Sequence, residues 1–107
     1  VGYGEGAEIA NRLERNNVIV NYQATPDEEG FTASGALRMG VSEMTRFGFG
    51  EKEFAQLASL MADCILRGKE IGPDVAKLRA RHLEMGYCFN DEQFETVLEK
   101  LAEKAGL

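Results

Sequence analysis

The residues with the clearest chemical purpose lie near the middle of the chain, at residues 34–40, with the sequence SGALRMG. As a short strand with alternating faces, this segment places Arg38 on one face between Ala36 and Gly40. An arginine between two small neighbours suits an anion-docking site, because its planar guanidinium holds a carboxylate by two parallel hydrogen bonds. A lysine would supply the charge without that geometry. The pattern therefore favours Arg38 as a docking site for an anion such as a carboxylate.

The length and composition are those of one small globular domain. The chain has 107 residues, of which 44% are hydrophobic and 28% are charged, a balance that supports a buried core. No apolar run approaches the roughly 20 residues that span a bilayer. A net charge of −6 argues against nucleic acids and anionic membranes as partners, because both require a positive surface field.

The two cysteines and the single histidine are interpreted as structural residues. Cys64 and Cys88 lie far apart and outside any CxxC spacing, which argues against a zinc ribbon or a disulfide framework. A reducing cytoplasm is the location that fits this usage. Cys64 shares a helical face with apolar residues, so we expect a buried, inert thiol, and the same interpretation holds for Cys88. His82 lacks a second metal ligand at a suitable spacing, so we expect it to be packed or partly exposed.

The N-terminal half is expected to contain one helix and two strands. The helix spans about residues 5–15, where the terminal charges suit the helix dipole, and Asn16 ends it. Residues 18–22, VIVNY, predict a strand with apolar contacts on both faces, which should pair near Arg38. Between the strands, residues 25–30 have the composition of an acidic, mobile turn.

Helical periodicity predicts three helices in the C-terminal half, over residues 51–67, 73–85 and 90–105. The first ends before Gly68, which suits a C-cap, and the second begins with Pro73. The third opens with a capping box formed by Asn90 and Gln93. The expected fold is therefore α+β, with a short sheet packed by helices and a helical C-terminal extension.

A glycine series, formed by Gly2, Gly4 and Gly6, has a superficial similarity to a phosphate-binding loop. It lacks a full preceding strand and an acidic residue at the expected distance downstream. A flexible lead into the first helix is the favoured interpretation.

The segment around Arg38 also carries a family resemblance. Ser-Gly before Arg38, Gly40 after it, and then Thr45 and Gly48 resemble the substrate-carboxylate segment of serine hydroxymethyltransferases. The resemblance covers about the first two thirds of the chain. It implies the small C-terminal domain of a fold-type I pyridoxal-phosphate enzyme, with residues 1–107 as one domain of a larger protein.

The resemblance also implies roles for individual residues. It assigns binding of the amino-acid carboxylate to Arg38, with Ser34 as a further substrate-binding residue. Gln23 stands in the segment that the family associates with folate contact. One residue more than usual separates Ser-Gly from Arg38, so we expect a bulge or shift before the arginine. Arg46 is interpreted as a surface charge.

The cofactor that the resemblance implies is pyridoxal phosphate, bound mainly by a large domain absent from this chain, with tetrahydrofolate as a co-substrate. No lysine here matches the family's cofactor lysine, because all lie in helical, charge-rich surroundings: Lys52, Lys69, Lys77, Lys100 and Lys104. We therefore expect no catalytic residue and no activity in the isolated chain. The implied partners are serine or glycine, the large domain, and a second copy in a homodimer.

Three functions remain open from the sequence. The first is interconversion of serine and glycine by the complete enzyme. The second is a folate-independent aldolase or transaldolase that acts on β-hydroxy amino acids, which Gln23 favours because the family has asparagine there. The third is a stand-alone, non-catalytic interaction module in which Arg38 is only a charge at a strand edge.

Overall fold

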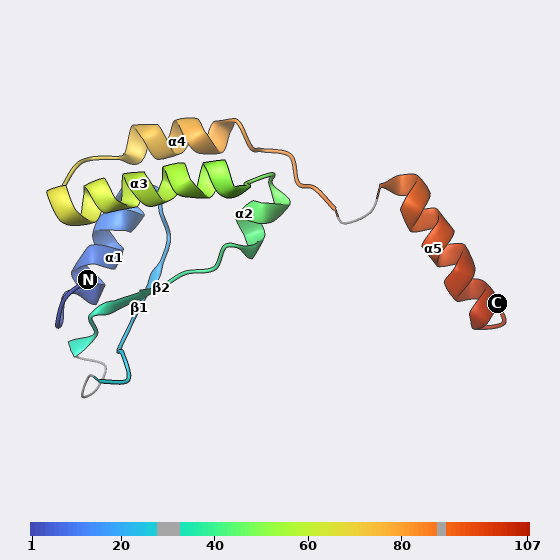
Figure 1. Ribbon diagram of the computed structural model, residues 1–107, viewed down its shortest axis with the longest axis horizontal. Helices are drawn as coiled ribbons and strands as arrows, with labels where there is room; N and C mark the ends of the chain where they lie inside the picture. Colours follow the sequence, from blue (N-terminus) through green and yellow to red (C-terminus); the bar gives the residue numbers. More distant parts are fainter. Residues whose placement is uncertain (28–32, 88–89) are drawn as a thin grey trace.

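The computed structural model describes residues 1–27, 33–87 and 90–107. The described part has an α+β fold with a two-stranded sheet, as predicted (Figure 1). Its elements are α1 (Gly6–Arg15), β1 (Asn21–Gln23), β2 (Ala36–Arg38), α2 (Ser42–Arg46), α3 (Glu51–Arg67), α4 (Gly72–Ala80) and α5 (Asp91–Lys104). Part of the acidic turn predicted over residues 25–30 lies outside the described residues, as does Cys88.

Helices α1 and α3 follow their predicted bounds. The α3 helix begins after Gly50, whose N–H donates to Glu53 Oε2 at 2.9 Å. It ends at Gly68, which adopts the left-handed conformation with φ 64°, a conformation that glycine adopts without steric cost. The residues at the two ends of α3 therefore carry the local information that sets its bounds.

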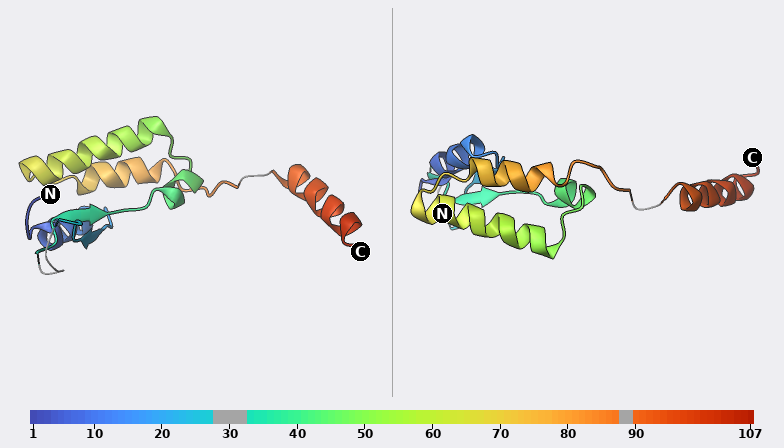
Figure 2. Two further views of the ribbon diagram at one scale, coloured as in Figure 1. Left: turned by 60° about the horizontal axis from the view of Figure 1, so that its bottom comes forward. Right: turned by 90° about the horizontal axis from the view of Figure 1, so that it is seen from above.

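The core lies between α1, α3 and α4. Its central residues are Ile9, Leu13, Met61, Cys64, Ile71 and Val75. Figure 2 shows α3 and α4 side by side on one side of α1 and the strands. The β1–β2 ribbon packs on α1 through Leu37, so the sheet has a single covering layer among the residues that the structure describes.

The ribbon corrects the predicted position of the first strand. Pairing near Arg38 is confirmed, because Asn21 lies opposite Arg38 in antiparallel register. The strand, however, starts at Asn21 and not at Val18. The expectation of apolar contacts on both faces is also wrong, since Val18 packs against the core while Ile19 is 85% exposed. Helices cover only one side of this segment, so its other side faces solvent.

The first residues of the chain are not the flexible lead that the sequence suggested. The backbone N–H groups of Gly2, Gly4 and Gly6 donate to carbonyl groups of residues 33–35, at 2.8 to 3.4 Å. Hydrogen bonds from these three glycines therefore hold residues 33–35, the segment that leads into β2, against the N-terminal segment.

Helix α4 is shorter than predicted, because it ends at Ala80 and not at Met85. Beyond it, the Arg79 side chain donates to the His82 carbonyl, and its guanidinium lies over the Phe47 ring, 4.3 Å from the centroid. The His82 ring meets Phe49 edge-on, with 5.0 Å between the centroids. These aromatic contacts fix a turn where the periodicity alone would continue the helix, and they leave Met85 43% exposed.

Helix α5 lies apart from the other elements. Its predicted capping box is confirmed, with Gln93 N donating to Asn90 Oδ1 at 2.8 Å and Asn90 N donating to Gln93 Oε1 at 3.1 Å. Figure 1 shows this helix away from the body, and its apolar residues Phe94, Leu98 and Leu101 are exposed. The radius of gyration is 19.5 Å, against about 13 Å for a compact chain of this length.

None of the helices in residues 1–27, 33–87 and 90–107 combines the length and the apolar character that crossing a bilayer requires.

Candidate functional site

Arg38 lies on the exposed face of the β1–β2 ribbon. Side chains alternate between the two faces of a strand, and residues directly opposite each other share a face. The register therefore places Arg38 beside its partner Asn21, with Gln23 on the same face opposite Ala36. Arg38, Asn21 and Gln23 are all exposed. The structure thus brings Arg38 and Gln23, two of the predicted site residues, to one solvent-facing surface.

The Arg38 guanidinium has no carboxylate partner within residues 1–27, 33–87 and 90–107. The ion pairs in this part of the chain lie on α1 and at the end of α3: Arg12 with Glu8, and Asp63 with both Arg67 and Lys69. The described part of the ribbon therefore leaves the guanidinium fork open to an incoming carboxylate.

Ser34 occupies a different environment from Arg38. It is 4% exposed, and its carbonyl oxygen accepts a hydrogen bond from the Gly6 N–H at 2.8 Å. Ser34 therefore lies two residues before β2, packed against the N-terminal segment. A substrate contact by Ser34 stays a prediction.

The pairing around Arg38 is regular. Residues 36–38 match residues 21–23 one to one, so β2 itself contains no bulge. The additional residue that separates Ser-Gly from Arg38 therefore leaves the register of these three pairs undisturbed.

Asn21 is a candidate site residue that the sequence reasoning missed. It lies directly opposite Arg38, and its exposed side chain amide adds a donor and an acceptor beside the guanidinium. The available signal in the sequence was the two-residue spacing of Asn21 and Gln23, which places both side chains on one face of a strand. That signal becomes informative only once the register of the ribbon is known.

The lysines test whether this chain fits pyridoxal phosphate. All five are exposed: Lys52, Lys69, Lys77, Lys100 and Lys104. A Schiff-base lysine needs a desolvated or otherwise activated amine, and none of these exposed side chains has that environment. The described residues therefore do not fit the cofactor by themselves, and no chemical step is assigned to it. The same residues contain no cluster of three His, Cys, Asp or Glu side chains that could hold a metal ion.

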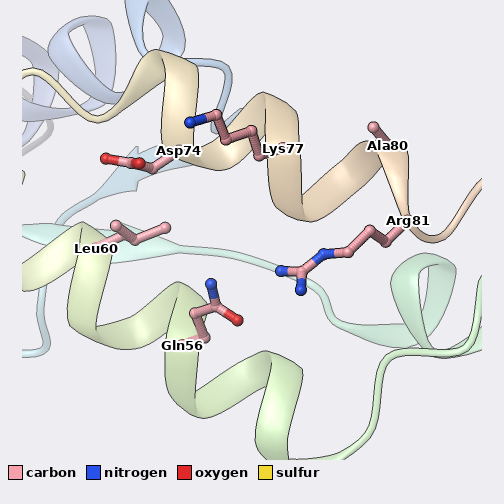
Figure 3. Close-up of a pocket in the computed structure, with 6 residues that line it drawn as sticks. All are labelled: Gln56, Leu60, Asp74, Lys77, Ala80 and Arg81. Atoms are coloured by element: carbon pink, nitrogen blue, oxygen red, sulfur yellow. The ribbon is translucent and has the colours of Figure 1, made fainter.

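An open hollow lies between α3 and α4, and none of its lining residues belongs to the ribbon. It is lined by Gln56, Leu60, Asp74, Lys77, Ala80 and Arg81 (Figure 3). Figure 3 shows the Arg81 side chain reaching from the end of α4 toward Gln56 on α3. Its lining combines apolar side chains with groups of both charge signs, and this mixture indicates no particular ligand.

The other residues considered in the sequence have structural surroundings. Cys64 is fully buried, and this burial raises the pKa of its thiol, as expected for an inert cysteine. His82 is partly buried against Phe49. Arg46 is exposed, with its guanidinium 5.8 Å from the centroid of the Tyr87 ring, which agrees with a surface charge.

Comparisons with known proteins match the chain to serine hydroxymethyltransferases. It is 38% identical over 90 residues to that of Pyrobaculum arsenaticum, which covers 81% of this chain and 21% of the relative. Identity is 37% over 95 residues with that of Cenarchaeum symbiosum, covering 82% and 22%. The serine hydroxymethyltransferase of Saccharolobus islandicus is 35% identical over 108 residues, which covers 96% of this chain and 24% of the relative. The chain thus spans between a fifth and a quarter of the length of these relatives. No protein-family model and no solved structure matches it.

Proposed function

Because this chain belongs to the serine hydroxymethyltransferase family over the length that it covers, we propose that it forms the small C-terminal domain of a pyridoxal-phosphate enzyme. The complete protein is proposed to have the fold-type I architecture and to interconvert serine and glycine, with tetrahydrofolate as the co-substrate. Residues 1–107 then supply one wall of the substrate site. The family relation supports the reaction, and the chain's own residues support the part that this domain plays in it.

The observation that carries the proposal is the position of Arg38. Its side chain lies on an exposed, regular ribbon, beside Asn21 and without a carboxylate partner among the described residues. An amino acid offers one carboxylate, which a guanidinium can hold in a fixed orientation by two parallel hydrogen bonds. Arg38 would therefore orient the substrate and direct its amino group toward residues outside this chain.

The cofactor is proposed to bind outside residues 1–107, on a large domain of the same protein. The exposure of all five lysines supports this division, because a Schiff-base lysine needs a desolvated or otherwise activated amine. A homodimer of the complete protein and a cytoplasmic location are further proposals, which rest on the family and on the sparse cysteines.

Gln23 separates the leading function from its alternative. Its amide shares the face of Arg38 and lies about 7 Å along the strand from Asn21. We assign it a folate contact in the leading function. A folate-independent aldolase would keep Arg38 and dispense with that contact, and glutamine in place of the family's asparagine favours this alternative. Cleavage of serine that requires tetrahydrofolate supports the first function, and cleavage that is indifferent to it supports the second.

The role of Arg38 is tested by glycine binding to the complete protein. Arg38→Ala should weaken binding by about 2 to 5 kcal/mol, because truncation leaves the carboxylate without its partner. Arg38→Lys should recover only part of the loss, since it keeps the charge without the fork. Arg46→Ala is the control, because Arg46 is an exposed arginine whose guanidinium lies near the Tyr87 ring. Glycine affinity unchanged in Arg38→Ala would contradict the proposal.

A further inference from the structure

Gly6 is a point of close contact between α1 and the ribbon. It is the first residue of α1, it is buried, and its N–H donates to the Ser34 carbonyl at 2.8 Å. A methyl group at Gly6 would lie 2.6 Å from that carbonyl oxygen and 3.2 Å from the carbonyl oxygen of Ala36. It would also lie 3.1 Å from Cβ of Tyr22. Both strands of the ribbon therefore rest against a position that has no room for a side chain.

The atoms that crowd Gly6 are mainly backbone atoms, so they cannot move aside by a change of rotamer. A Cβ contact of 2.6 Å is too short to persist, and its relief requires the segment that leads into β2 to shift. The ribbon has only three residue pairs, and Arg38 is in the last of them along β2. A displacement at Ser34 or Ala36 is therefore passed along the strand to Arg38.

We propose that Gly6 is a positioning residue, which sets the place of the Arg38 guanidinium by letting the ribbon lie directly on the start of α1. The proposal rests on the carboxylate role of Arg38 proposed above. A bidentate contact tolerates little misalignment, because a binding group has to lie within about 0.5 Å of its productive position. The glycine at residue 6 is thus required by the distant arginine and not only by the local turn.

The test uses the complete protein and two probes, glycine and glycinamide, which lacks the carboxylate. Gly6→Ala should lower glycine affinity about tenfold and leave glycinamide affinity unchanged. Gly72→Ala is the matched control, because Gly72 is also the first residue of a helix and donates its N–H. A methyl group there would meet its nearest atom at 3.6 Å, an ordinary contact. Both affinities should therefore stay unchanged in the control.

A double-mutant cycle separates positioning from a general loss of structure. In the Arg38→Ala background, Gly6→Ala should have little further effect on glycine, because the group that it displaces is already gone. Additive losses, or an equal loss of both probes in Gly6→Ala, would overturn the proposal. Full glycine affinity in Gly6→Ala alongside a loss in Arg38→Ala would overturn it while the role of Arg38 stands. Full glycine affinity in Arg38→Ala would overturn both.

Gly4→Ala provides a milder variant in case Gly6→Ala does not fold. Gly4 donates its N–H to the Ala33 carbonyl at 3.2 Å, and no atom lies within 4 Å of the added methyl group. The only strain comes from its φ of +73°, a conformation that alanine rarely adopts. Glycine affinity should fall about twofold to threefold, with glycinamide unaffected. No change for glycine in this variant would also overturn the proposal.

Discussion

The buried side chain of Asn16 accepts a hydrogen bond from the backbone N–H of Ile71, with 2.7 Å between Oδ1 and N. The same oxygen accepts from the Gly72 N–H at 2.9 Å, and the Asn16 amide nitrogen donates to the Arg12 carbonyl at 3.0 Å. One side chain thus completes the end of α1 and the start of α4, which are far apart in the sequence. These hydrogen bonds connect α1 to α4, the two helices that enclose the core together with α3.

Replacing Asn16 by alanine should destabilise the protein by about 2 to 3 kcal/mol, because the buried Ile71 N–H and the partly buried Gly72 N–H lose their acceptor. Urea unfolding at equilibrium measures this free energy. Asn11→Ala is the matched control, since Asn11 is an exposed asparagine on the same helix, and its effect should stay within about 0.5 kcal/mol. Equal effects of the two substitutions would show that the Asn16 contacts do not connect α1 to α4.

The Glu53 carboxylate should make stability depend on pH in the acid range. The hydrogen bond from the Gly50 N–H lowers the pKa of Glu53 from its ordinary value. A carboxyl with a lower pKa in the folded state contributes stability above its unfolded pKa, and that contribution disappears as pH falls through the folded pKa. Unfolding free energy between about pH 5 and pH 3 should therefore fall more steeply in the wild type than in Glu53→Gln.

The matched variant for that titration is Glu51→Gln, which removes a charge from the same helical turn and keeps the acceptor of the Gly50 N–H. Its pH dependence should follow that of the wild type more closely. Parallel curves for the wild type and Glu53→Gln would contradict the assigned hydrogen bond.

Cys64 should react with a thiol reagent only when the structure opens. Its side chain is fully buried, and the burial raises the thiol pKa, so both access and thiolate content are low near neutral pH. In a Cys88→Ser background, labelling at pH 7.5 should be at least about a hundredfold slower in buffer than in urea. Similar rates in the two conditions would show that the core around Cys64 is open.

The amides of α5 should exchange with deuterium much faster than those of α3. An isolated helix of its length is only marginally stable in water, and α5 lies apart from the core that covers α3. Mass spectrometry of peptides from the two helices, measured on residues 1–107, provides the comparison. Equal protection would show that the apolar face of α5 is covered in solution.

The sequence was sufficient where structure depends on neighbouring residues. The ends of α3 follow from Glu53 at its start and Gly68 at its end, and the start of α5 follows from the Asn90 capping box. Prediction failed where contacts from distant residues decide. Ile19 is exposed because, within the described residues, helices cover only one side of the segment before β1, and α4 stops at Ala80 where aromatic contacts begin.

The candidate site shows the same division. Arg38 could be identified from alternation and from its small neighbours, because both are properties of consecutive residues. The position of Asn21 opposite it requires the register of the ribbon. The need for glycine at residue 6 requires the approach of Ser34, which lies 28 residues away in the sequence. Such residues become visible only in the folded chain.

The most direct measurement of the role of Arg38 is a crystal structure of the complete protein with glycine bound. The proposed function predicts two hydrogen bonds from the Arg38 guanidinium to the glycine carboxylate, each with a nitrogen-to-oxygen distance of about 2.7 to 2.9 Å. A glycine carboxylate held by other residues, with the Arg38 guanidinium in solvent, would contradict it.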